Sequence, residues 1–345
     1  MAAVEVPTAW LAGVHTGLVG PTSAPLPPLT VASGLTTWTL DPVALAVVLV
    51  AGAVYVAGLR QMRGRQAWSL WRTVSFTGGL LTIVAVTLAG VGAYSHTLFA
   101  TYAVQVISLL AVAPTLLALG APISLVRAAW PARTTGLDRV LRTLPLRLLT
   151  WPVVGSFVVA LGPLLFYLTP WFEASLRHYA VYELTHLVLL GVGFAYFWPL
   201  AGVDPVAWRM PAAVLAVIVL AETLFDAIPG LVIWLSTRLL APAYYLGLHR
   251  DWGRSPLADQ KLGGALLWGV GESVGLPFMA IVIAHWLRQD AAEAAAVDAA
   301  EDARAAATRP LGPTGDDGPE ALLQRPWWET DPRFTDRYGP RRPSP

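Results

Sequence analysis

The chain has 345 residues, of which 55% are hydrophobic and only 13% are charged, and its mean hydropathy is +0.57. This composition is far more apolar than that of an ordinary soluble domain and argues against a water-soluble globular protein. A net charge of +1, without a basic cluster rich in aromatic residues, argues against nucleic acid as a partner, and the absence of cysteine excludes disulfides and thiolate metal sites.

Residues 1–40 are expected to form a flexible N-terminus outside the cytoplasm. The segment lacks the basic start of a secretory signal and carries Glu5, and Pro25, Pro27 and Pro28 follow. We therefore expect this segment to be retained rather than cleaved.

Long apolar stretches make up most of residues 41–290. Each is close to the about 20 residues that a helix needs to cross a bilayer. They run over 43–59, 74–94, 98–120, 149–168, 179–201, 212–237 and 262–287. The sequence therefore predicts an all-α membrane protein, a bundle of seven transmembrane helices in contact with the lipid bilayer.

The arginines predict the orientation of this bundle, because cytoplasmic loops carry an excess of Lys and Arg. They gather after the first and third stretches: Arg60, Arg63, Arg65, Arg72, Arg127, Arg133, Arg139, Arg142 and Arg147. Both loops are expected to be cytoplasmic, which places the N-terminus outside and the C-terminus inside. In this orientation the loop 238–261 faces outward. The loop also holds basic residues, which argues against the orientation, but the larger number of arginines in the other two loops outweighs them.

The last part of the chain is polar. Residues 291–309 are rich in alanine and charge, which predicts a helical extension into the cytoplasm that ends at Pro310. Residues 310–345 are predicted to be a disordered cytoplasmic tail, with a short docking cluster at 326–329.

Ionisable residues inside the predicted spans are the first candidates for function, because such groups are unfavourable in a bilayer unless they face a partner or a cavity. Glu222 and Asp226 lie one helical turn apart, and Glu272 lies near the middle of the last span. Glu183 and His186 share a face near the outer end of the fifth span. The plainer alternative is that these acids hydrogen-bond neighbouring helices or stay protonated.

Histidines gather on the predicted outer side, where an imidazole could bind copper or zinc. They are His15, His96, His178, His249 and, just below the surface, His186. Surface histidines are also ordinary, and none of these forms a His-x-x-x-His pair. With no cysteine, and with Met279 alone among the methionines well inside a span, tight Cu(I) binding is not expected. Copper binding is therefore expected to be weak or absent.

Two further classes of protein are disfavoured. A retinal protein needs a lysine deep in its last span, but the single lysine, Lys261, lies at the mouth of that span. An enzyme is not expected, because the chain shows no nucleophile elbow, phosphate-binding glycine loop or cofactor fingerprint.

Several short motifs resemble the CtaG-type membrane-embedded cytochrome c oxidase assembly proteins. The run 94–105 (YSHTLFATYAVQ), continuing through Ala113-Pro114 to 119–122 (LGAP), is similar to the third-span signature of that family. Three more stretches resemble it: 197–200 (FWPL) with 202–205 (GVDP), 258–260 (ADQ) with 263–264 (GG) and 271–272 (GE), and 326–329 (PWWE). The resemblance covers most of 40–340, and the scarcity of lysine is typical of the GC-rich bacterial branch.

The chain departs from the family at histidine positions. The family carries histidines where this chain has Tyr102 and Val106, is richer in histidine around the fifth span where Tyr182 and Val188 stand, and has one at the position of Asp226. Of that set His186 remains, while Asp259, Gln260 and Glu272 match.

The resemblance implies an assembly factor that assists copper insertion into, or maturation of, a haem-copper cytochrome c oxidase in the bacterial plasma membrane, with the oxidase subunits as partners. His186 would be a metal ligand, Asp226 and Glu222 would replace lost imidazoles, and Glu272 would orient them or balance charge. His96 is a further candidate ligand. The remaining candidate functional residues are Tyr102, Glu183, Asp259 and Gln260.

Two alternatives stay open. One is a proton- or ion-coupled transporter that uses Glu222, Asp226 and Glu272. The other is a membrane scaffold without a ligand. The oligomeric state is left open by the sequence.

Overall fold

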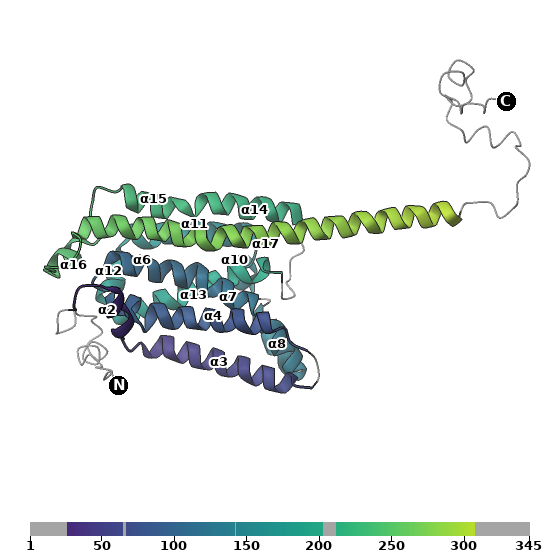
Figure 1. Cartoon of the computed structure of the whole chain (residues 1–345), viewed down its shortest axis with the longest axis horizontal. Helices are drawn as coiled ribbons and strands as arrows, with labels where there is room; N and C mark the ends of the chain where they lie inside the picture. The colour runs from purple at the N-terminus through teal and green to yellow at the C-terminus, as the bar shows by residue number, and fades with distance from the viewer. Residues whose placement is uncertain (1–25, 65–66, 142, 203–211, 308–345) are drawn as a thin grey trace, which may run out of the picture. The chain divides into compact units, whose positions relative to one another are not determined.

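The computed structural model describes residues 26–64, 67–141, 143–202 and 212–307, and these residues form helices without a strand. The chain divides into two units, Met1–Arg288 and Gln289–Pro345. In the first unit the long helices lie side by side and roughly antiparallel (Figure 1). The predicted N-terminal segment up to 25 and the predicted tail from 310 fall outside the described residues.

The helices follow one another with short connections. The first half contains α2 (Val31–Thr36), α3 (Pro42–Met62), α4 (Leu70–Thr87), α5 (Gly90–Tyr94), α6 (Phe99–Ile107), the π-helical turn η1 (Ser108–Val112), α7 (Ala113–Leu119) and α8 (Pro122–Ala129). The second half contains η2 (Pro131–Arg133), α9 (Thr134–Leu141), α10 (Leu144–Leu149), α11 (Pro152–Leu168), α12 (Pro170–Arg177), α13 (Tyr179–Leu200), α14 (Ala212–Phe225), α15 (Ala227–Leu235), α16 (Pro242–Gly247) and α17 (Pro256–Ala307).

Within the described residues, five or six helices meet the length and composition of a membrane span, so the predicted count of seven stays a prediction. Five in the described part of the chain are long and apolar enough: Pro42–Met62, Leu70–Tyr94, Phe99–Ala129, Tyr179–Leu200 and Val214–Leu235. A sixth is possible if α11 and α12, bent by 70° at their junction, count as one span. The seventh predicted stretch lies in α17 and does not join this set. The described part of the chain is thus all-helical, and its several apolar helices indicate a multi-pass membrane protein.

The segment Phe99–Ala129 lies at the centre of the bundle, because 78% of its most apolar 18-residue stretch is buried. It packs between α4 and α13. Its π-helical turn precedes Pro114, which has no N–H to donate to the carbonyl of Leu110. Gly193 of α13 lies against that carbonyl, and a Cβ there would come within 2.0 Å of the Leu110 oxygen. The missing side chain therefore permits close contact between the two helices.

Two buried polar side chains at the start of α17 form hydrogen bonds with the start of α6 and with the loop after α15. The Oδ2 atom of Asp259 accepts a hydrogen bond of 2.7 Å from the backbone N–H of Phe99, at the first turn of α6. Burial raises the pKa of the Asp259 carboxyl, and this backbone hydrogen bond opposes the rise. Gln260 accepts from the N–H of Leu240 at 2.7 Å and donates to the carbonyl of Arg238 at 3.0 Å. Both side chains thus have structural partners.

The two ends of the bundle differ in character. The short helices α2, α12 and α16 lie at one end, called the α16 end below, and α8 and α10 lie at the other (Figure 1). The described arginines after α3 and around α8 to α10 belong to the second end, where Arg127 pairs with Asp138 at 2.7 Å.

Replacing Asp259 should destabilise the bundle. Asp259→Ala leaves the buried N–H of Phe99 without a partner, at a cost of about 1–3 kcal/mol in the free energy of unfolding. The thermal midpoint of the purified protein in detergent should fall by several degrees, whereas the exposed Asp251→Ala in the same segment should leave it unchanged. Equal midpoints for wild type and Asp259→Ala would refute this role.

Candidate functional site

Asp41 places a carboxylate at the α16 end because it begins α3. Its Oδ1 accepts a hydrogen bond of 2.8 Å from the N–H of Ala44, and Pro42 follows at the first helical position. An acidic N-cap before proline is a favourable way to start a helix. The second oxygen, Oδ2, points to α13 and lies 4.0 Å from Nδ1 of His186.

Glu183 and His186 lie three residues apart on α13, so both project from the face turned toward Asp41, as their spacing predicts. One possible ligand atom from each of the three side chains lies within 4.8 Å of the other two. The exposed fractions are 1% for Asp41 and 6% for both Glu183 and His186. A cavity of about 20 Å³ adjoins Glu183 and His186, with room for about one water molecule.

The three side chains, called the Asp41 cluster below, hold buried polar atoms without hydrogen-bond partners. These atoms are Oδ2 of Asp41, both carboxyl oxygens of Glu183 and both ring nitrogens of His186. Tyr179 interacts with the Glu183 carboxyl. Burial raises the pKa of the Asp41 carboxyl, and the hydrogen bond from Ala44 opposes the rise. The cluster is therefore polar and incompletely satisfied by the described part of the protein.

The ring of Tyr182 lies between the rings of His186 and His96 and contacts both at an angle. The Tyr182 ring lies 4.0 Å from the His186 ring and 4.6 Å from the His96 ring, between centroids. The Tyr182 hydroxyl is held by Ser95 at 3.2 Å and by the amide of Gln105 at 2.9 Å. His96 is half-buried, and its burial lowers the pKa of its imidazole to about 4. Its ring is therefore neutral at pH 7.

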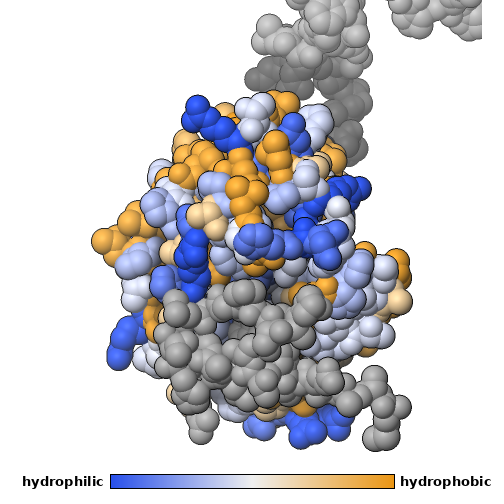
Figure 2. Space-filling view, turned by 90° about the vertical axis from the view of Figure 1, so that its left-hand side faces the viewer, coloured by the Kyte–Doolittle hydropathy of each residue, from blue (hydrophilic) through white to orange (hydrophobic). Residues whose placement is uncertain are grey.

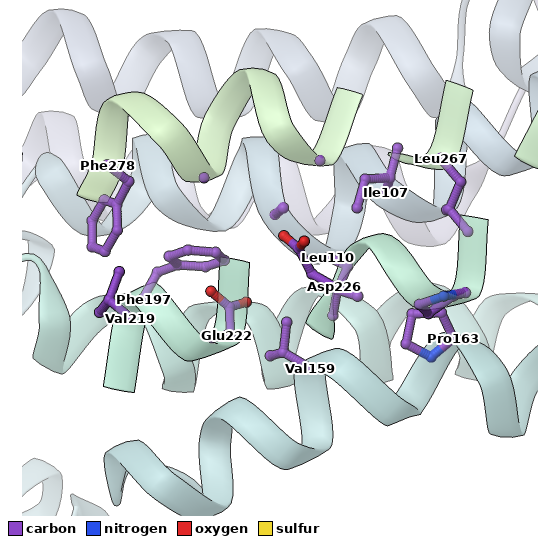
Figure 3. A pocket seen from close by; sticks show the side chains of 14 residues that line it. Ile107, Leu110, Val159, Pro163, Phe197, Val219, Glu222, Asp226, Leu267 and Phe278 are labelled. Carbon is purple, nitrogen blue, oxygen red and sulfur yellow. The ribbon is translucent and has the colours of Figure 1, made fainter. Parts of the chain in front are cut away.

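Glu222 and Asp226 line a different cavity, of about 30 Å³, between α11, α14, α17 and the central helix. In Figure 3 both carboxyl groups point into the space below α17. The hydrogen bonding of the helix is interrupted at Asp226, between α14 and α15, because Pro229 has no N–H for the carbonyl of Phe225. Glu272 of α17 accepts a hydrogen bond of 3.3 Å from Trp268 and interacts electrostatically with both acids.

The structure therefore divides the predicted site residues into two groups. His186, Glu183 and His96 come together near the α16 end, whereas Glu222 and Asp226 line the other cavity and Glu272 interacts electrostatically with both. A single site that combines His186 with Glu222 and Asp226 is not what the structure shows.

The remaining predicted residues lie elsewhere. Tyr102 is fully buried and donates a hydrogen bond of 2.8 Å to Ser175. Asp259 and Gln260 accept hydrogen bonds from the backbone N–H groups of Phe99 and Leu240. His178 and His249 are exposed, and His15 lies outside the described residues.

Sequence reasoning missed Asp41. The available signal was an acidic residue immediately before proline at the head of an apolar stretch, which is typical of a helix N-cap. That signal indicates a helix start but not which side chain the second carboxylate oxygen will face.

Figure 2 looks onto the α16 end, where hydrophilic side chains are spread among hydrophobic ones. Basic residues in or next to α12 and α16 lie at this end of the bundle: Arg177, His178, His249 and Arg254. Such a mixed surface suits contact with water and lipid headgroups better than contact with the hydrocarbon core.

Comparisons with known proteins point to one family. Among protein-family models, that of the cytochrome c oxidase caa3 assembly factor (Caa3_CtaG) matches residues 53–289. The similar curated proteins include Uncharacterized protein Mb0105 of Mycobacterium bovis, 27% identical over 77% of this chain and 42% of the relative. Another is Uncharacterized protein ML1998 of Mycobacterium leprae, 28% identical over 74% of this chain and 40% of the relative. The chain thus spans about two fifths of the length of these relatives. No solved structure matches.

The low pKa of His96 predicts a pH-dependent stability. Between the folded value of about 4 and the unfolded value of about 6.5, the unfolded chain binds more protons, so stability rises with pH across this range. Lowering the pH from 7 to 5 should therefore reduce the thermal midpoint of the metal-free wild type more than that of His96→Gln. The exposed His249→Gln serves as the matched control and should behave as wild type. The same pH dependence in His96→Gln and wild type would show that His96 is not the group responsible.

Proposed function

Because this chain belongs to the family of cytochrome c oxidase caa3 assembly factors, we propose that it assists copper insertion into, or maturation of, a haem-copper cytochrome c oxidase in the bacterial plasma membrane. The observation that carries the proposal is the family match over 53–289, on a helical bundle with a buried carboxylate–imidazole cluster near one end. The partners would be oxidase subunits, and the chain would act without catalysing a reaction of its own.

The proposed topology has seven spans, with the first part of α17 as the seventh. The arginines at the end that carries α8 and α10 favour a cytoplasmic position for that end. The α16 end then faces outward, and the Asp41 cluster lies just below the outer surface. Copper would reach the cluster from outside the cytoplasm.

Copper would be a cargo held briefly rather than a resident cofactor. The cluster offers carboxylate and imidazole ligands, which suit Cu(II) better than Cu(I). His96, on the far side of the Tyr182 ring, would act as a first contact for the ion on its way to His186. Glu222 and Asp226 would not take part in this step, because they line a separate cavity, and neither would Glu272, which interacts with these two acids.

A second candidate function, proton- or ion-coupled transport, is supported by that separate cavity. Glu222 is buried and Asp226 half-buried, and both line it beside the break between α14 and α15. If this function holds, proteoliposomes should show flux driven by a pH or ion gradient, and Glu222→Gln should abolish it. Liposomes without flux would remove this candidate.

The assembly role is tested in membranes from a deletion strain grown with and without added copper. We expect loss of the haem-copper oxidase spectrum and of oxygen consumption, with partial recovery in added copper because the copper step becomes less dependent on delivery. Complementation by His186→Ala should fail, whereas complementation by the exposed His178→Ala should succeed.

Other outcomes separate the alternatives. Loss that copper does not restore would favour a scaffold without a ligand. An oxidase unchanged by the deletion would contradict the proposed function.

A further inference from the structure

We propose that Asp41, Glu183 and His186 form a binding site for one divalent transition-metal ion, Cu(II), between the start of α3 and the first turns of α13. The inference deepens the proposed function and rests on it only for the purpose of the bound ion.

The charge of the cluster calls for a cation. Asp41 and Glu183 are more than nine-tenths buried and close enough to interact, and no arginine or lysine among the described residues forms an ion pair with either. Two neighbouring buried carboxylates are unfavourable unless protons or a cation neutralise them. A divalent ion would neutralise both at once, whereas a shared proton would neutralise one.

The orientation of the three side chains also suits an ion. One oxygen of Asp41 is engaged by Ala44, so the other is held toward His186. The atoms that face one another lack hydrogen-bond partners, which is the state expected of ligands that await a shared ion. Hydrogen bonds that orient a ligand in this way strengthen metal binding.

The spacing requires only a small closure. Ligand atoms about 2.0 Å from a square-planar Cu(II) ion lie about 2.8 Å from their neighbours and about 4.0 Å from the atom opposite. The present separations, up to 4.8 Å overall and 4.0 Å between Asp41 and His186, can be closed by modest side-chain rotations. Three protein ligands leave a fourth position for water or a receiving group, as an exchangeable site needs.

The ligand set selects the ion. Carboxylate and imidazole groups are poor ligands for Cu(I), which prefers thiolate and thioether sulfur, and the chain has no cysteine. Among divalent ions a site of nitrogen and oxygen ligands generally binds Cu(II) most tightly. We therefore expect the affinity order Cu(II), then Zn(II), with Cu(I) weakest.

Metal titration of the purified full-length protein in detergent tests the site. Chelator-buffered Cu(II) should bind at one ion per chain, and Glu183→Gln, Asp41→Asn and His186→Ala should each weaken binding by at least about tenfold. The matched controls are Glu222→Gln in the other cavity and the exposed His178→Ala, which should bind as wild type does. Thermal midpoints measured without metal show whether each variant is folded. If His186→Ala does not fold, the conclusion rests on Glu183→Gln, whose side chain has nearly the same shape as that of glutamate.

The results separate this inference from the proposed function. Copper binding that depends on Glu183, in a protein whose deletion leaves the oxidase intact, would keep the site and reject the assembly role. A lost oxidase with no Cu(II) binding would keep the assembly role and reject the site. Binding that the cluster variants leave unchanged, or that only His178→Ala removes, would also reject it.

Discussion

Polar side chains buried among apolar helices must find partners within the protein, because the bilayer core offers no water to replace them. Gln105 follows this rule by bonding the Val86 carbonyl and the Tyr182 hydroxyl, and Asp259 follows it by capping α6. The Asp41 cluster departs from it, since three adjacent ionisable side chains share unpartnered buried atoms. Single unpartnered atoms occur elsewhere, as at Oδ1 of Asp226, but among the described residues the Asp41 cluster brings several of them within 4.8 Å of one another.

Much of the fold could be predicted because a long apolar stretch has one stable form in a bilayer, the helix. The ends of the helices were less predictable. The third stretch was expected to end at 120, but Ala121 adopts a left-handed conformation and Pro122 then starts α8, so the apolar helical segment reaches Ala129. The number of spans and the orientation depend on α17 and on loop charge, and they stay predictions.

The candidate site was predictable only within one helix. The three-residue spacing of Glu183 and His186 predicts a shared face, and the structure has it. Asp41 joins them through a contact between segments far apart in the chain, which no local pattern encodes. Conversely, Glu222 and Asp226 were expected to assist His186, but α14 and α15 pack against α11, and both acids line a separate cavity.

The account depends on a metal ion held by one imidazole and two carboxylates. Electron paramagnetic resonance of the Cu(II)-loaded protein measures this directly, because nitrogen ligands split the copper signal. We expect coupling to one imidazole nitrogen, abolished in His186→Ala and kept in His178→Ala. Coupling to several nitrogens, or a spectrum unchanged in His186→Ala, would contradict the account.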